Sequence, residues 1–152
     1  MSPEHPLIHV TVAAVVQDAV NRFLMVEERI DGRLVLNQPA GHLEADESLT
    51  AAVVRETLEE TGWEFIPQGL VGVYRWVSPA GDVYLRTAFF GSPGRRVRDT
   101  LEEGIVAVRW IGTPALRAAA DRHRSPLVWR CVADFLEGRR YPLALLTDLT
   151  SD

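Results

Sequence analysis

The chain has 152 residues, of which 47% are hydrophobic and 24% charged, and its net charge is −5. This length and hydrophobic content predict one domain over residues 1–152 with a substantial core, and the negative charge argues against a nucleic-acid duplex as partner. A single cysteine excludes an internal disulfide framework. No signal peptide or membrane-length apolar run is present, so we expect a cytoplasmic protein without membrane contact, either a monomer or a homodimer.

The first half of the chain combines strand patterns with one helix. Residues 8–16 are rich in Val and Ile and predict a buried strand, and residues 22–28 predict a strand that pairs with it. A turn then leads into a short strand over residues 33–37. A helix is expected over residues 48–61.

The second half is expected to be mostly sheet, followed by helices. Residues 70–77 and 83–90 predict a hairpin, and residues 106–111 predict a further strand. Helices are expected over residues 114–121 and 125–136, where a proline marks each start. The order of these elements predicts an α/β (α+β) fold, with helices on the faces of a mixed sheet.

The expected helix over residues 48–61 places acidic side chains where its apolar stripe should continue. At 100° per residue, the core-facing positions are Leu49, Ala52, Val53, Glu56, Glu59 and Glu60. Clustered carboxylates repel one another, and more strongly when they are partly buried. A hard divalent cation with oxygen ligands removes this conflict, and Mg²⁺ is the usual ion beside a phosphate. The pattern therefore predicts a metal-dependent hydrolase that acts on a phosphate compound.

The spacing of these acids and their neighbours resembles the signature of the Nudix hydrolases. Its seven fixed positions are filled here by Gly41, Glu47, Arg55, Glu56, Glu59, Glu60 and Gly62. Thr57 stands where an aliphatic residue is usual, which is a mild departure. The alternative, a solvated acidic helix end, leaves the glycine and the arginine unexplained. The resemblance implies the Nudix α/β/α sandwich with a mixed central sheet.

Several motif residues also have a physical role that the spacing predicts. Gly41 precedes the helix, where a positive φ or a close backbone approach favours glycine. Gly62 follows the last turn and suits a left-handed C-terminal cap. Arg55 lies four residues before Glu59 and can fix its carboxylate by a charge-assisted hydrogen bond. The resemblance implies that Glu47 braces the loop rather than binding metal.

The resemblance also implies the chemistry, which is in-line attack of water on phosphorus with help from bound metal. The expected ligands of Mg²⁺, with Mn²⁺ as a possible substitute, are the Glu56 and Glu60 carboxylates. Glu59 is a further ligand or a bridge through water, and the backbone carbonyl of Ala40 is an additional ligand. Glu56 is alternatively the general base. Arg55 is expected to act with these catalytic acids.

A fourth acid often comes from a loop far along the chain in Nudix enzymes. Glu102 and Glu103 precede the strand expected at residues 106–111, and we favour Glu103 as the additional catalytic residue. A solvated loop acid is the alternative, and Asp99 is a weaker choice.

Segments outside the signature resemble the NudJ group of bacterial Nudix phosphatases, at residues 9–13, 37–44, 124–128 and 140–143. This resemblance implies release of phosphate from hydroxymethylpyrimidine pyrophosphate, thiamine pyrophosphate and nucleoside di- and triphosphates. One alternative is a pyrophosphatase that cleaves a nucleoside diphosphate derivative such as ADP-ribose into two monophosphates. Another is a ligand-sensing domain, but such domains tend to lose the signature carboxylates, and this chain keeps them.

Five residues are candidates for substrate contact. Tyr74 and Trp76 share one face of a strand, where one of them stacks on a pyrimidine ring or both pack in the core. Trp76 is favoured because the NudJ group has a tryptophan at the matching place. Gln38 and His42 flank the expected metal site. Arg86 is expected either to bind a phosphate or to form an ion pair.

Overall fold

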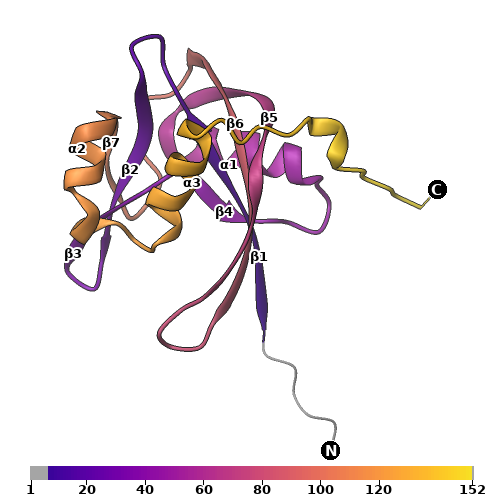
Figure 1. Cartoon of the computed structure of the whole chain (residues 1–152), viewed down its shortest axis with the longest axis horizontal. Coiled ribbons are helices and arrows are strands. Elements are labelled where there is room, and N and C mark those ends of the chain that lie inside the picture. The colour runs from indigo at the N-terminus through magenta and orange to yellow at the C-terminus, as the bar shows by residue number, and fades with distance from the viewer. Residues whose placement is uncertain (1–6, 152) are drawn as a thin grey trace, which may run out of the picture.

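The computed structural model describes residues 7–151. In that range, seven strands and three α-helices make up the fold, together with two short 3₁₀-helices (Figure 1). The strands are β1 (Ile8–Val16), β2 (Arg22–Ile30), β3 (Arg33–Asn37), β4 (Ala40–His42), β5 (Trp63–Val77), β6 (Val83–Arg96) and β7 (Ile105–Gly112). The helices are α1 (Leu49–Thr61), α2 (Thr113–Ala118) and α3 (Leu127–Leu136), with 3₁₀-helices at Ala120–Arg122 and Leu143–Leu145.

The strands form two sheets. Sheet A has the order β4-β1-β6-β5 and is mixed, because β1 runs parallel to β6 while the other neighbours are antiparallel. Sheet B has the order β3-β2-β7 and is antiparallel throughout. The predicted mixed sheet is confirmed, and sheet B is a second sheet that the sequence did not separate from it.

The expected pairing of the strand at residues 22–28 with the first strand is wrong. Both edges of β1 are occupied, by β4 on one side and β6 on the other. β2 therefore pairs within sheet B, and only an isolated bridge between Gln17 and Phe23 connects the two strands.

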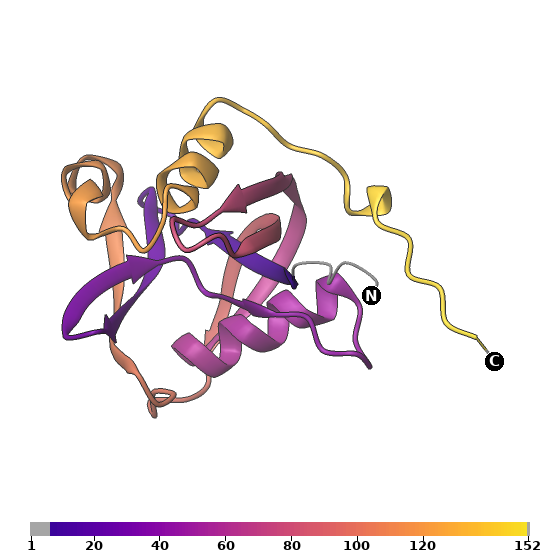
Figure 2. The ribbon, with the colours of Figure 1, turned by 90° about the horizontal axis from the view of Figure 1, so that it is seen from below.

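β1 is buried on both faces, which explains its continuous apolar sequence. Val12, Ala14 and Val16 pack in a core cluster that includes residues of α1, whereas Val15 packs in the cluster that includes residues of α3. Figure 2 shows α1 (magenta) and α3 (yellow) on opposite sides of the strands. Sheet A is therefore the middle layer of the predicted sandwich. None of the helices described for residues 7–151 is long and apolar enough to cross a membrane.

The boundaries of α1 follow from its cap residues. Ser48 lies in an extended conformation, and its hydroxyl accepts a hydrogen bond from the Ala51 amide at 3.1 Å. At the other end, Gly62 has a φ of 76° and its amide donates to the Leu58 carbonyl oxygen. The predicted left-handed cap at Gly62 is thus confirmed.

The buried stripe of α1 differs from the expected one in its second half. Its fully buried residues are Ala52, Val53, Thr57, Glu60 and Thr61. The two hydroxyl groups tolerate burial because each donates to the carbonyl four residues earlier, at 2.8 Å for Thr57 and 2.6 Å for Thr61. Glu56 and Glu59 lie on the flank of this stripe and stay partly exposed. The acids therefore face the edge of the core, where an ion has access to them.

Two strands are much longer than predicted, and one was not predicted. β5 begins at Trp63, directly after the helix cap, and β6 continues to Arg96. Register shifts between these two strands interrupt the period-2 pattern that would have revealed them. β4 has three residues, too few to carry a recognisable pattern.

Candidate active site

Arg55 is the centre of a hydrogen-bond network on the acidic face of α1. Its Nε and Nη2 donate to the two carboxylate oxygens of Glu47 at 2.9 and 2.6 Å. Its Nη1 donates to Glu56 at 2.9 Å and to Glu59 at 3.1 Å, and Nη2 also donates to the His42 carbonyl oxygen at 3.1 Å. The hydrogen bonds from Arg55 hold the pKa of Glu47 below its ordinary value. The predicted contact between Arg55 and Glu59 is confirmed, and Arg55 fixes Glu56 as well.

Gly41 leaves the space that the Glu56 carboxylate occupies. A Cβ atom at position 41 would overlap the carboxylate carbon and both oxygens of Glu56. Gly41 is not among the glycines with positive φ. Of the two expected reasons for glycine here, the structure therefore supports close approach rather than backbone conformation.

Three carboxylates from two distant segments converge beside this network. Glu56, Glu59 and Glu102 each offer an oxygen within 4.8 Å of the others. Glu102 belongs to the loop between β6 and β7, as expected for a fourth acid. The structure brings Glu102 rather than Glu103 or Asp99 to this cluster, although all three side chains are exposed.

Glu60 lies apart from that cluster and is 6% exposed. Its Oε1 accepts a hydrogen bond from the Ala40 amide at 2.7 Å. Burial raises the pKa of Glu60 to about 9, and the charges of Glu28 and Glu56 add to the rise, although the hydrogen bond from Ala40 opposes it. Burial also raises the pKa of Glu56. Carboxyl groups that are so costly to ionise need either a proton or a nearby cation.

This donor set fits a hard divalent cation such as Mg²⁺. The converging side chains of Glu56, Glu59 and Glu102 supply oxygen ligands only, which suits such an ion. The space kept free by Gly41 allows the Glu56 carboxylate to lie against the backbone of β4. Burial, with a smaller contribution from neighbouring carboxylates, raises the pKa values of Glu56 and Glu60, and a bound cation would favour their ionised forms.

A cleft of about 380 Å³ opens beside Glu60. Residues of both sheets and of the start of α3 line it. Among them are Thr11, Ala40, His42, Glu60, Trp76 and Arg86. Three of the five candidate substrate contacts, His42, Trp76 and Arg86, thus share one cleft with Glu60 and Ala40. Gln38 does not line it.

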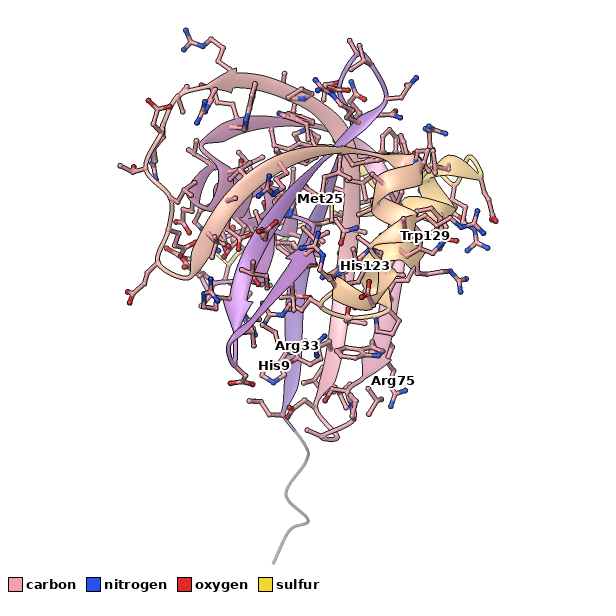
Figure 3. The ribbon with its side chains drawn as sticks, turned by 90° about the vertical axis from the view of Figure 1, so that its left-hand side faces the viewer. His9, Met25, Arg33, Arg75, His123 and Trp129 are labelled. Carbon is pink, nitrogen blue, oxygen red and sulfur yellow. The ribbon has the colours of Figure 1, made fainter. Side chains whose placement is uncertain are left out.

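A row of three aromatic rings lies beside this cleft, and two of them, Trp76 and Tyr84, line it. His9 lies near the N-terminal end of β1 (Figure 3), and its ring stacks on Tyr84 with centroids 4.7 Å apart. Tyr84 in turn contacts Trp76 at 5.5 Å. Tyr74 does not line this cleft, because it packs against the core and its hydroxyl donates to Asp134 at 2.7 Å. Of the two aromatic candidates, Trp76 is the one that lines this cleft.

Arg86 is 6% exposed and is held by neutral groups. Its Nη1 donates to Gln38 at 3.1 Å and its Nη2 to Asn37 at 3.3 Å. Gln38 is 1% exposed, and its amide nitrogen donates to the Val128 carbonyl oxygen of α3 at 2.6 Å. Gln38 therefore links the Arg86 guanidinium to the backbone of α3 and fixes its position. The ion pair considered for Arg86 is not found among the described residues.

Sequence reasoning missed three residues at this cleft. Tyr84 stacks in the aromatic row, Glu28 accepts a hydrogen bond from Arg124 at 2.6 Å, and His9 Nδ1 lies 3.0 Å from His42 Nε2. The pairing of β1 with β6 places His9 beside Tyr84, and no local pattern announces that pairing. A bulge immediately before Glu28 interrupts the alternation of side chains along β2. The face of the strand to which Glu28 belongs was therefore not predictable.

Comparison with known proteins agrees with this geometry. The NUDIX domain family model matches residues 7–130, a range that includes the acidic helix and every residue that lines the cleft. The chain belongs to the Nudix family and is a hydrolase that acts on phosphoanhydride bonds of small-molecule substrates. It is 40% identical over 142 residues to phosphatase NudJ of Escherichia coli strain K12, which covers 92% of this chain and 91% of NudJ. Phosphatase NudJ of Shigella flexneri matches to the same extent.

Solved structures confirm the fold. A NUDIX hydrolase from Nitrosomonas europaea superposes with a TM-score of 0.90 at 43% identity, covering 95% of this chain and 98% of that one. A bifunctional NMN adenylyltransferase/ADP ribose pyrophosphatase from Francisella tularensis superposes with a TM-score of 0.71 at 22% identity, covering 89% of this chain and 42% of the other. The second likeness shows a shared fold alone.

Proposed function

We propose that this protein is a Mg²⁺-dependent phosphohydrolase that releases orthophosphate from pyrophosphate compounds of modest size. The substrates we propose are hydroxymethylpyrimidine pyrophosphate, thiamine pyrophosphate and nucleoside di- and triphosphates. The observation that carries the proposal is one cleft whose ends differ, with Glu60 and the acidic cluster near one end and Trp76 at the other. The similarity to phosphatase NudJ over most of both chains supports the same reaction.

The size of the cleft favours this substrate class over a dinucleotide. Its volume of about 380 Å³ is near the lower end for small-molecule sites. One heteroaromatic ring with a short phosphate chain fits such a space better than two nucleoside groups. We therefore rank orthophosphate release above cleavage of ADP-ribose into two monophosphates.

At the acidic end, we propose that Glu56, Glu59 and Glu102 bind Mg²⁺ together with Glu60 and the backbone carbonyl of Ala40. When bound, the ion would neutralise phosphate oxygens and make water a better nucleophile. Arg55 does not contact the substrate in this scheme. It positions Glu56 and Glu59 through its Nη1, while its bonds to Glu47 fix its own orientation.

Glu56 is also the residue best placed to accept a proton from the attacking water. Its Oε1 already accepts a hydrogen bond from Arg55, and no bond to a described residue occupies its second oxygen. Burial raises its pKa toward the range in which a carboxylate is an effective base near neutral pH. Measuring the Mg²⁺ affinity of a Glu56→Gln variant separates the roles, because a ligand loses affinity whereas a base loses only kcat.

At the other end, we propose that Trp76 stacks on the organic ring. Between Trp76 and the acids, we propose that His42 and Arg86 contact the phosphate chain. Tyr84 and His9 extend the aromatic row behind Trp76 and hold its ring in place. Such stacking contributes about 1–3 kcal/mol per ring where it has been measured on nucleic acids.

The proposal is tested by measuring orthophosphate release with Mg²⁺ across thiamine pyrophosphate, its pyrimidine precursor, nucleoside di- and triphosphates, and ADP-ribose. Glu60→Gln is the test variant. Glu64→Gln is the matched control, because Glu64 is a partly exposed carboxylate just beyond the helix. Its only ion pair within residues 7–151 is with Arg95, at 3.9 Å. We expect release from the pyrophosphate compounds by the wild type and the control, with at least a 100-fold loss in Glu60→Gln.

Other outcomes lead to different functions. Two monophosphates from ADP-ribose without orthophosphate release would move the protein to the pyrophosphatase class. Binding of these compounds without any turnover would make it a ligand-sensing domain.

A further inference from the structure

The buried guanidinium of Arg86 has no anionic partner in the described part of the chain. The side chain is 6% exposed, yet its hydrogen-bond acceptors are the neutral amide oxygens of Gln38 and Asn37 and the Cys131 sulfur at 3.9 Å. Its Nε has no acceptor among residues 7–151. A buried charge without a counter-ion is costly, so proteins rarely keep one without a use for it.

The acids near the cleft do not neutralise Arg86. Glu60 and Asp82 line the cleft but form no ion pair with Arg86 among residues 7–151, and two other acids are paired with different arginines. Glu28 pairs with Arg124 at 2.6 Å. Asp134, on the same helix as Cys131, pairs with Arg130 at 3.1 Å and also lies 3.7 Å from Arg139. The positive charge of Arg86 is therefore available inside the cleft that it lines.

The strand register places Arg86 between the two ends of the cleft. Arg86 pairs with Thr11 on β1, and Thr11 pairs with His42 on β4. Because neighbouring strands lie about 4.8 Å apart, the Arg86 backbone is about 10 Å from β4, within the combined reach of its long side chain and a short phosphate chain. Tyr84 lies two residues before Arg86 on the same face of β6, and it pairs with Trp76 on β5. A ligand that spans the acidic end and Trp76 passes Arg86.

We infer that Arg86 binds the anionic group that remains on the organic product, which is the phosphate next to the scissile bond. This inference rests on the proposed function and deepens it. Arg86 then selects substrates that keep a phosphate after hydrolysis, such as diphosphates and triphosphates, over simple phosphate monoesters. Gln38 and Asn37 aim the guanidinium, and because both are neutral, they leave its charge for the substrate.

The test measures binding without metal and without turnover. Thermal unfolding is followed in EDTA with increasing inorganic phosphate, against chloride at equal ionic strength. For the wild type, we expect a saturable rise of about 3 °C or more once phosphate reaches ten times its dissociation constant. Arg86→Gln and Arg86→Lys lose most of this rise. Arg22→Gln, which removes an equal charge outside the cleft where Arg22 pairs with Asp18, keeps it.

This readout separates binding from a structural role. If Arg86 only supports the fold, the variants unfold at a lower temperature in chloride but respond to phosphate as the wild type does, which overturns the inference. An equal response in wild type and Arg86→Lys overturns it as well, because lysine keeps the charge but loses the planar fork.

A second measurement distinguishes the phosphate from the ring. Cytidine and cytidine monophosphate are titrated into the same metal-free proteins. If Arg86 binds the remaining phosphate, the preference of the wild type for the monophosphate falls at least tenfold in Arg86→Gln, while the affinity for cytidine is kept. If the affinities for cytidine and for cytidine monophosphate fall equally, Arg86 contacts the nucleoside rather than the phosphate, and the inference is wrong. Failure of orthophosphate release would refute the proposed function but would not affect these binding results.

Discussion

Replacing Gly41 with alanine separates the chemistry of the site from the stability of the fold. The new Cβ would overlap the Glu56 carboxylate, which must withdraw by about 1 Å to restore ordinary contact distances. The clash is with the end of a flexible side chain, so the free energy of unfolding changes by less than about 1 kcal/mol. A displacement of about 1 Å at a reacting group lowers kcat about 100-fold, which is about 2.7 kcal/mol of transition-state stabilisation.

The assay compares kcat for orthophosphate release, the Mg²⁺ dissociation constant and the unfolding midpoint of Gly41→Ala and wild type. Gly112→Ala is the control, because the nearest atom that a Cβ there would meet in the described residues, apart from its chain neighbours, is Pro114 Cδ at 4.0 Å. We expect the control to match the wild type in kcat and Gly41→Ala to lose activity at an almost unchanged midpoint. A kcat within threefold of wild type, or a loss that follows a fall in the midpoint, would refute the proposal that Gly41 makes room for a catalytic Glu56.

Three further predictions address the other parts of the site. In a metal titration, we expect Glu102→Gln to lower the Mg²⁺ affinity at least tenfold and Glu103→Gln to keep an affinity near that of the wild type. The opposite result would restore Glu103 as the fourth acid. Without metal, the free energy of unfolding falls by about 1.4 kcal/mol per pH unit between pH 6 and 8. The pKa of Glu60 is about 9 in the folded protein and about 4.5 in the unfolded chain, so in this range the folded protein keeps a proton that the unfolded chain has lost. Denaturant titrations check this, and a flat profile contradicts the buried carboxyl. Gly62→Ala lowers the unfolding midpoint by about 5 °C in calorimetry, since φ is 76° and a Cβ would overlap the Arg98 carbonyl oxygen; an unchanged midpoint would show that the cap adapts.

The parts of the fold that were predictable depend on residues close together in the sequence. Gly62 fixes the end of α1 within one turn, and the four-residue spacing brings Arg55 to Glu59. The predicted buried stripe of α1 was wrong beyond the helix midpoint, because the prediction placed only apolar or acidic residues on it and treated threonine as a polar, exposed residue. Thr57 is fully buried, since its hydroxyl is satisfied by the Val53 carbonyl oxygen.

The parts that were not predictable depend on pairings between distant segments. The choice between Glu102 and Glu103 is made where the Arg29 amide donates to the Gly104 carbonyl oxygen at 3.3 Å and holds the loop against β2. The sequence around Arg29 and Gly104 contains no pattern that predicts this hydrogen bond. Likewise, the use of Trp76 rather than Tyr74 at the cleft follows from the position of α3, which offers Asp134 to the tyrosine hydroxyl.

The position of β1 at the centre of sheet A also determines the order in which this protein can gain activity during folding. β5 and β6 are neighbours in sequence and form early, because their loop is short and cheap to close. β1 must then dock in parallel beside β6, although the paired residues are separated by about half of the chain, which is a slow, non-local step. In the part of the chain that the structure describes, β1 is the only strand that pairs with β4, so the backbone of Ala40 to His42 is placed after that docking. Enzymatic activity should therefore recover in the last kinetic phase of refolding, after most of the secondary structure has returned.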